Sequence, residues 1–168
     1  SIMASEIKVD TIVNAGGDND TGIDLATNDQ ILLKVANATK LTMNSTGQTT
    51  IVGEGGTTTT SLQQGLAKHW VNFNGESTPA IQDSLNSASL VDNGTGDYAT
   101  NLINNMSNSN YGFGLATKGN DSDLWGIASE NRSTSQIEIT TKYHSNGNSA
   151  VLTADRSAMS STIHGDLA

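Results

Sequence analysis

The amino-acid sequence predicts an all-β protein in which a short N-terminal β shaft or attachment segment, a short junction helix and a C-terminal antiparallel β-sandwich follow one another. Thr, Ser, Asn and Gly make up 75 of the 168 residues, and this composition suits turns and solvated strands better than helices. Apolar residues recur at alternate positions in short runs, which is the period of a half-buried strand. Clusters of turn-forming residues separate these runs.

Residues 1–60 contain short alternating runs with few large side chains. The turn-forming stretches AGGDNDTG, ATND, ANAT and NSTG lie between them, so each predicted strand is only three to six residues long. A segment of this kind does not bury a core alone, whereas several copies wound around a shared axis would do so. We therefore expect a β-rich shaft or attachment region. Its apolar positions are Ile7, Val9, Ile23, Leu25, Ile31, Leu33, Val35, Leu41, Met43 and Ile51.

Residues 61–70 predict a junction helix after a polar linker. The stretch GEGGTTTT at 53–60 contains no apolar residue, so we expect a linker or a change of direction there and place the boundary in it. Leu62, Leu66 and Trp70 are spaced four residues apart, which places them on one face of a helix, and Ser61 is available as the N-cap. Because so short a helix is unstable alone, we expect these three side chains to pack at a trimer axis or at the base of the tip.

Residues 71–168 predict the tip domain and the main hydrophobic core. Alternating apolar runs separated by turn clusters such as DNGTGD and KGNDSD are typical of an antiparallel sandwich. Seven or eight strands fit this length. The runs are centred on Val71 and Phe73, Ile81 and Leu85, Tyr98 and Leu102, Tyr111 to Leu115, Trp125 and Ile127, Ile137 to Tyr143, Val151 and Ile163.

Composition also limits the possible partners. The formal net charge of −9 repels phosphate backbones, so nucleic acid is not expected as a partner. No apolar run approaches the roughly 20 residues of a membrane span, so no membrane insertion is expected. Leu, Ile, Val and Phe amount to 34 of 168 residues and there is no cysteine. Since neither a large core nor disulfides stabilise a monomer, we expect the chain to form an oligomer.

Three stretches resemble a tip module of bacteriophage tail-fibre proteins, especially those of marine phages. They are KHWVNFNG at 68–75, IQDSLNSASLVDNGTGDY at 81–98 and NNMSNSNYGF at 104–113. The stretch KLTMNSTGQTTIVG at 40–53 similarly resembles the strand, turn and strand units of phage fibre shafts. The resemblance covers roughly half the chain.

The resemblance implies a homotrimer in the virion, which attaches to another virion protein through its N-terminal region and adheres to a host surface glycan or protein. A capsid fibre or decoration protein with a structural role is the alternative. A glycan-cleaving depolymerase is a third candidate, but we find no Gly-x-Ser-x-Gly, no His-Glu-x-x-His, no phosphate-binding Gly loop and no Cys nucleophile. We therefore expect a protein that is not an enzyme.

No cofactor and no metal site are expected. Asp18, Asp20 and Asp24 match the first part of a calcium loop, but the closing bidentate Glu is missing, and NDSD at 120–123 is interpreted in the same way as a polar turn. The histidines at 69, 144 and 164 are too far apart in sequence for a local metal motif.

Receptor-binding residues are expected on turn regions of the tip. A glycan site combines an aromatic ring that stacks on a sugar with amide, carboxylate or guanidinium groups that hydrogen-bond its hydroxyls. Two stretches meet this requirement: 120–125, and 131–132 together with 143–146. The candidate residues are Trp125, Asn131, Arg132 and Tyr143. A core position for Trp125, which alternates with Ile127, is the competing interpretation.

Overall fold

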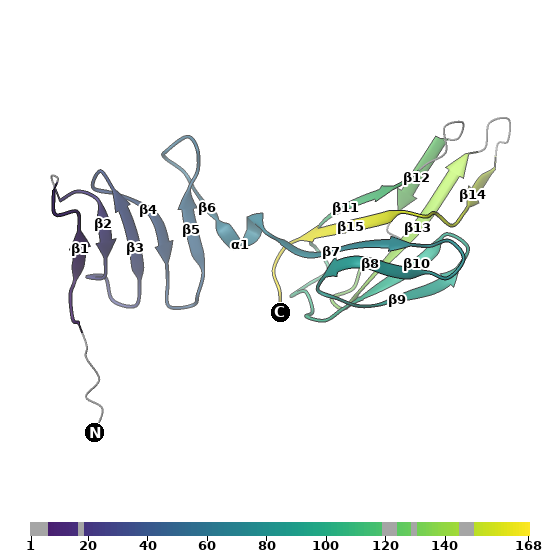
Figure 1. The fold of residues 1–168 in the computed structure, drawn as a ribbon, viewed down its shortest axis with the longest axis horizontal. Helices are drawn as coiled ribbons and strands as arrows, with labels where there is room; N and C mark the ends of the chain where they lie inside the picture. Colours follow the sequence, from purple (N-terminus) through teal and green to yellow (C-terminus); the bar gives the residue numbers. More distant parts are fainter. Residues whose placement is uncertain (1–6, 17–18, 119–123, 129–130, 145–149) are drawn as a thin grey trace, which may run out of the picture. The chain divides into compact units, whose positions relative to one another are not determined.

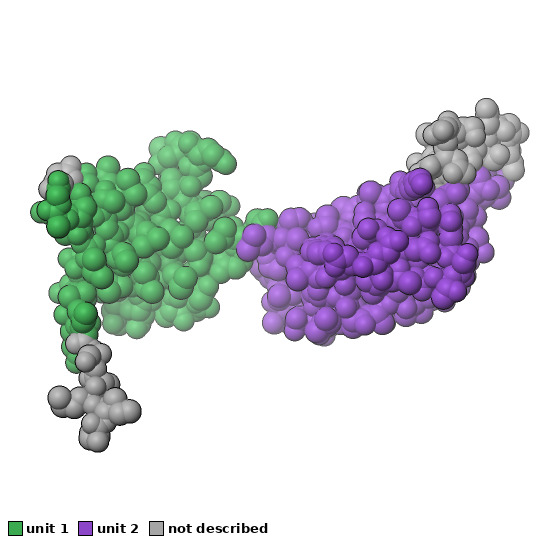
Figure 2. Space-filling view, in the orientation of Figure 1, with its two compact units in different colours: residues 1–65 green, residues 66–168 purple. Residues whose placement is uncertain are grey.

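The computed structural model confirms the all-β class, with antiparallel sheets and one short helix (Figure 1). It describes residues 7–16, 19–118, 124–128, 131–144 and 150–168, and for 124–128 it describes the backbone. The chain divides into two compact units, Ser1–Gly65 and Leu66–Ala168 (Figure 2). Each unit is considered by itself below.

The first unit is a six-stranded antiparallel meander in which each strand pairs with the next along the chain. Figure 1 shows these strands side by side in a single layer. Ala36 and Asn37 both have positive φ, 53° and 58°, which is the geometry of a two-residue type I′ hairpin turn. The strands are β1 (Thr11–Val13), β2 (Gly22–Asp24), β3 (Ile31–Val35), β4 (Ala38–Met43), β5 (Thr49–Val52) and β6 (Thr59–Ser61).

The junction differs from the prediction in the extent of its helix. The stretch 53–60 is a change of direction rather than a linker, because Thr59–Ser61 forms β6 and pairs with β5 in a hairpin. The helix predicted over 61–70 is a single turn, α1 (Leu62–Gly65). Ser61 does cap it as predicted, since the Gln64 N–H donates to Ser61 Oγ at 3.3 Å.

The predicted helix ends early because the residues after Gly65 are better paired as a strand. Strand β7 (Ala67–Asn74) pairs with a strand on each side, and His69, Val71 and Phe73 are buried at alternate positions. Trp70 therefore lies in a strand rather than on a helix. Leu62 and Leu66 are 38% and 56% exposed, so the expected stripe of three residues does not form.

The second unit is a β-sandwich of two antiparallel sheets. The four-stranded sheet has the order β11-β15-β7-β8, and the other has the order β12-β13-β10-β9, with β14 also paired to β13. The nine strands exceed the seven or eight expected. Besides β7 they are β8 (Ala80–Leu85), β9 (Ser87–Gly94), β10 (Asp97–Leu102), β11 (Gly112–Thr117), β12 (Leu124–Ala128), β13 (Gln136–His144), β14 (Val151–Thr153) and β15 (Met159–His164).

The hydrophobic core lies between these two sheets. Strands β7 and β15 of one sheet, β10 and β13 of the other, and Met106 between β10 and β11 contribute its fully buried side chains. The rings of Phe73 and Tyr98 meet edge to face with their centroids 5.3 Å apart. All buried hydrophobic residues of the described chain lie in this unit: Val71, Phe73, Tyr98, Ala99, Leu102, Met106, Tyr111, Ile137, Ile139, Met159 and Ile163.

A carboxylate joins three loops at one end of the core. Asp155 Oδ1 accepts a hydrogen bond from the Gly96 N–H at 2.7 Å and from the Tyr98 hydroxyl at 2.5 Å. The same hydroxyl lies 2.8 Å from the Gly75 carbonyl oxygen. A Cβ at Gly75 would lie 2.6 Å from the Tyr98 hydroxyl oxygen, so only glycine fits there. Burial, and then the Asp155 carboxylate, raise the pKa of Tyr98.

Candidate functional site

The residues predicted for receptor binding lie in two separate places, Asn131 with Arg132 and Trp125 with Tyr143. Arg132 forms an isolated bridge with Ile137 near the start of β13, whereas Tyr143 lies six residues further along that strand, about 20 Å away at 3.4 Å per residue. Trp125 pairs in register with Tyr143, but its side chain lies outside the described residues, as do residues 120–123 and 145–149. Asn131 is exposed, and its carbonyl accepts a hydrogen bond from Glu138 N–H.

Arg132 and Arg156 each place a guanidinium group over an aromatic ring. The Arg132 guanidinium carbon lies 5.8 Å from the centre of the Phe113 ring, and that of Arg156 lies 5.9 Å from the centre of the Tyr143 ring. Such cation–π contacts stabilise the fold by about 0.5 to 1 kcal/mol at exposed sites. Arg132 and Tyr143 thus have packing roles that explain their positions without a ligand.

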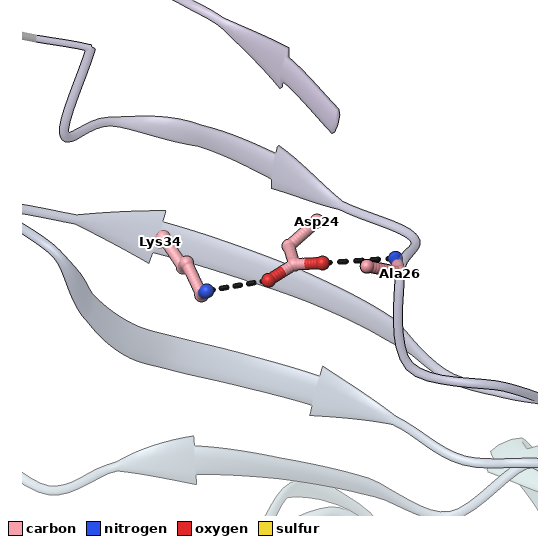
Figure 3. Close-up of polar contacts among 3 residues, drawn as sticks. All are labelled: Asp24, Ala26 and Lys34. Carbon is pink, nitrogen blue, oxygen red and sulfur yellow. Dashed lines mark hydrogen bonds and ion pairs between the residues drawn. The ribbon is translucent and has the colours of Figure 1, made fainter. Parts of the chain in front are cut away.

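The described aspartates of the calcium-like stretch accept hydrogen bonds from groups of this chain. The carboxylate of Asp24 accepts hydrogen bonds from Lys34 Nζ and, at 2.9 Å, from Ala26 N–H (Figure 3). These bonds, that of Lys34 first, lower the pKa of Asp24. Asp20 Oδ1 accepts a hydrogen bond from Thr21, and Asp18 lies outside the described residues. Within the described part of the chain, no three His, Cys, Asp or Glu residues are grouped to hold a metal ion.

The three histidines do not belong to any metal-binding group within the described residues. His69 is fully buried in β7, and its Nε2 lies 2.9 Å from Ser87 Oγ. Burial lowers the pKa of His69 to about 4, so its imidazole is neutral at physiological pH. His144 and His164 are exposed at the ends of β13 and β15.

An open hollow lies on the outer face of the four-stranded sheet, opposite to the core. Its volume is about 390 Å³, and β7, β15 and β11 line it. Trp70 pairs in register with Thr162, which in turn pairs with Gly114. In the next row of the same face, Asn72 pairs with Ser160, which pairs with Ala116.

The shape of the hollow follows from the size of these side chains. Gly114 and Ala116 leave the β11 side of the face nearly bare, whereas the half-buried Trp70 forms a wall on β7. Between them, Thr162 and Ser160 place hydroxyl groups on the central strand β15. Among the described residues that line the hollow, none is ionisable. The arrangement is an aromatic face beside neutral hydrogen-bonding groups, on strands held rigidly by the core beneath.

Sequence reasoning assigned Trp70 to a helix and did not identify the other residues of the hollow. One signal was present in the sequence GFGLAT, where Gly112 and Gly114 alternate within a strand. Glycine inside a strand often marks a place where another group approaches the backbone closely. The pairing of β11 with β15, 42 or more residues apart in sequence, was needed to place Gly114 beside Thr162.

Comparison with known proteins gives no relative: no family model, no curated protein and no solved structure matches this chain. In the described residues there is no helix of the length and apolar character needed to cross a membrane.

Proposed function

We propose that this chain is a virion fibre protein of a bacterial virus, a homotrimeric tail-fibre adhesin whose C-terminal sandwich binds a host surface glycan. The observation that carries the binding function is the hollow beside Trp70. Its half-buried indole borders a space of about 390 Å³, which lies within the size range of small-molecule sites. The placement in a virion rests on the resemblance of residues 68–75, 81–98 and 104–113 to phage tail-fibre tips.

The chemistry of the hollow suits a neutral sugar ring. The C–H groups on one face of a pyranose form an apolar patch that packs against the flat face of an indole. The hydroxyls of Ser160 and Thr162 and the amide of Asn72 can donate to and accept from sugar hydroxyls. Since no ionisable group of the described residues lines the hollow, the binding should depend little on salt concentration.

The same residues support binding without catalysis. Glycoside hydrolysis requires two carboxyl groups about 5 to 9.5 Å apart across the scissile bond. The described residues that line the hollow contain no carboxylate. We therefore propose an adhesin that is not an enzyme, and assign the depolymerase the lowest place among the three candidates.

The experiment measures binding of the purified protein to surface polysaccharide isolated from the host bacterium. Ala116→Gln introduces a neutral side chain into the hollow from the exposed side of β11, and Trp70→Ala removes the stacking surface. Each should weaken binding at least about tenfold, which corresponds to about 1.4 kcal/mol. Ala80→Gln, at an exposed alanine on β8, is the matched control and should bind normally.

The same assay separates the competing proposals. Undiminished binding by Ala116→Gln and Trp70→Ala, together with weakened binding by Arg132→Ala and Tyr143→Ala, would move the site to the loop residues. Absence of binding by the unaltered protein, with labelling of intact particles over the capsid, would favour the capsid fibre or decoration protein. New reducing ends in the polysaccharide would identify a glycan-cleaving enzyme.

A further inference from the structure

The six-stranded sheet of the first unit carries a continuous row of aliphatic side chains. Residues paired in an antiparallel register lie on the same face of a sheet. Ile12 pairs with Ile23, Ile23 with Leu33, Leu33 with Leu41, and Leu41 with Ile51. The row therefore crosses five successive strands without a polar residue.

Further apolar residues widen this row. Ile31 and Val35 lie two residues from Leu33 on β3, and Met43 pairs with Ile31 across β3 and β4. Because side chains alternate along a strand, they share the face of the row. We call the eight residues the aliphatic face: Ile12, Ile23, Ile31, Leu33, Val35, Leu41, Met43 and Ile51.

The opposite face is mainly polar. Its central row consists of Thr11, Asp24, Leu32, Thr42, Thr50 and Ser61, in which Leu32 is the exception. The ion pair between Asp24 and Lys34 lies on this face (Figure 3). A sheet with one polar and one apolar face is the pattern of a sheet that packs another layer on its apolar side.

The first unit does not supply that layer itself. No residue of the aliphatic face is buried; Ile12 is 53% exposed, Val35 49% and Leu33 39%. Among the described residues of the first unit only Thr49 is buried. Because the apolar side chains of this unit are half-buried or exposed, only a small hydrophobic term offsets the entropy lost in ordering its backbone.

The aliphatic face is large enough to mark an interaction surface. Its five strands, β1 to β5, are three to six residues long, so at about 3.4 Å per residue and about 4.8 Å between strands they cover roughly 340 Å². A contiguous apolar patch of a few hundred Å² is often a site of protein interaction. Three such faces packed around an axis bury about 1,000 Å² in total, which approaches the size of a specific protein interface.

We infer that the aliphatic face of the first unit packs against the aliphatic faces of other copies of this chain. A copy is the occupant because the unit needs the cover in order to fold, and copies are present wherever the chain is made. A face without a charged residue is also complementary to itself, as an interface around a symmetry axis requires. The inference names the surface that holds together the proposed homotrimer, and it does not depend on the glycan site.

Sedimentation equilibrium of the full chain at about 10 µM tests the inference. The unaltered protein should sediment at about three times 17.5 kDa, and Leu33→Asp should reduce this mass toward that of one chain. Thr42→Asp adds the same charge on the opposite face of the neighbouring strand, and it should leave the mass unchanged. A single-chain mass for the unaltered protein, or an unchanged mass for Leu33→Asp, would overturn the inference.

A second measurement covers the case in which Leu33→Asp does not fold. The chain has no cysteine, so Leu33→Cys and Thr42→Cys each carry one thiol. A maleimide should react with the thiol at position 33 at least about tenfold more slowly than with that at position 42. Equal rates for the two variants would show an uncovered aliphatic face and reject the interface, whether or not the sandwich binds polysaccharide.

Discussion

The two units of this chain have the same kind of strand pairing and opposite ways of burying apolar side chains. In the second unit two sheets face each other, and Ile137, Ile139 and Phe73 are completely buried. In the first unit one sheet stands in a single layer, and Ile12 and Val35 are about half exposed. Antiparallel pairing satisfies the backbone hydrogen-bonding groups in both units, but among the described residues only the second unit has a hydrophobic core of its own. We infer that the first unit receives its second layer from other copies of the chain.

The largest expected effect compares a core residue of the second unit with a residue of the aliphatic face of the first. Ile139→Ala should lower the free energy of unfolding of the second unit by about 2 to 5 kcal/mol, because it leaves a cavity between the sheets. The denaturation midpoint of this unit should not depend on protein concentration. The midpoint of the first unit should fall on dilution, because dilution favours separated copies, and Leu33→Ala should lower it further wherever the unaltered protein is associated. Chemical denaturation at 1 and 100 µM measures both units, and a first-unit midpoint that is the same at the two concentrations would contradict the comparison.

Acid should weaken the second unit through His69. Its folded pKa is about 4, below the value of about 6.5 in an unfolded chain. Between these pH values the unfolded state binds a proton that the folded state does not. Stability should therefore be complete above pH 6.5, fall as the pH decreases to 4, and lose at most about 3 kcal/mol from this group.

The variant His69→Gln isolates that contribution, because glutamine can hydrogen-bond Ser87 Oγ but does not titrate. Its melting temperature should change less between pH 6.5 and 4 than that of the unaltered protein. His164→Gln, at an exposed position, should retain the full acid sensitivity. Identical pH profiles for all three proteins would show that the buried imidazole is not the acid-sensitive group.

A smaller effect is expected at the carboxylate that joins the loops of the sandwich. Asp155→Ala removes the acceptor for Gly96 N–H and a partner of the buried Tyr98 hydroxyl, so the free energy of unfolding should decrease by about 2 kcal/mol. Asp83→Ala, at an exposed position on β8, should change it by less than about 0.5 kcal/mol. Equal decreases in the free energy of unfolding for the two variants would show that the hydrogen bonds of Asp155 do not stabilise the sandwich.

Much of the fold could be predicted from alternation within the sequence. The buried pairs Val71 and Phe73, and Ile137 and Ile139, have the period of two that a sheet imposes, and they lie in strands as expected. Strand β9, Ser87–Gly94, was not predicted, because its residues are mostly small or polar and it pairs only with β10. The predicted extent of the helix was wrong. The spacing of Leu62, Leu66 and Trp70 fits one face of a helix, but Trp70 also fits the alternation of exposed and buried residues in strand β7.

Less of the candidate site could be predicted, because it is formed by residues far apart in sequence. Trp70, Gly114 and Thr162 come from three strands whose pairing no local pattern specifies. Arg132 was chosen because its polar surroundings left it unexplained, and its contact with Phe113 became apparent only when the two strands were placed in space. The weakness of the N-terminal core, by contrast, was visible in its short strands and few large side chains.

The central claim is that the first unit has its hydrophobic layer between copies of the chain and the second has it within one chain. Hydrogen exchange of the full-length protein, followed by mass spectrometry from 1 to 100 µM, tests it most directly. Peptides from β2 to β5 should become more protected as the concentration rises, whereas peptides from β7, β10 and β13 should be equally protected throughout. Protection of β2 to β5 at the level of the sandwich in a sample that sediments as a single chain would contradict the account.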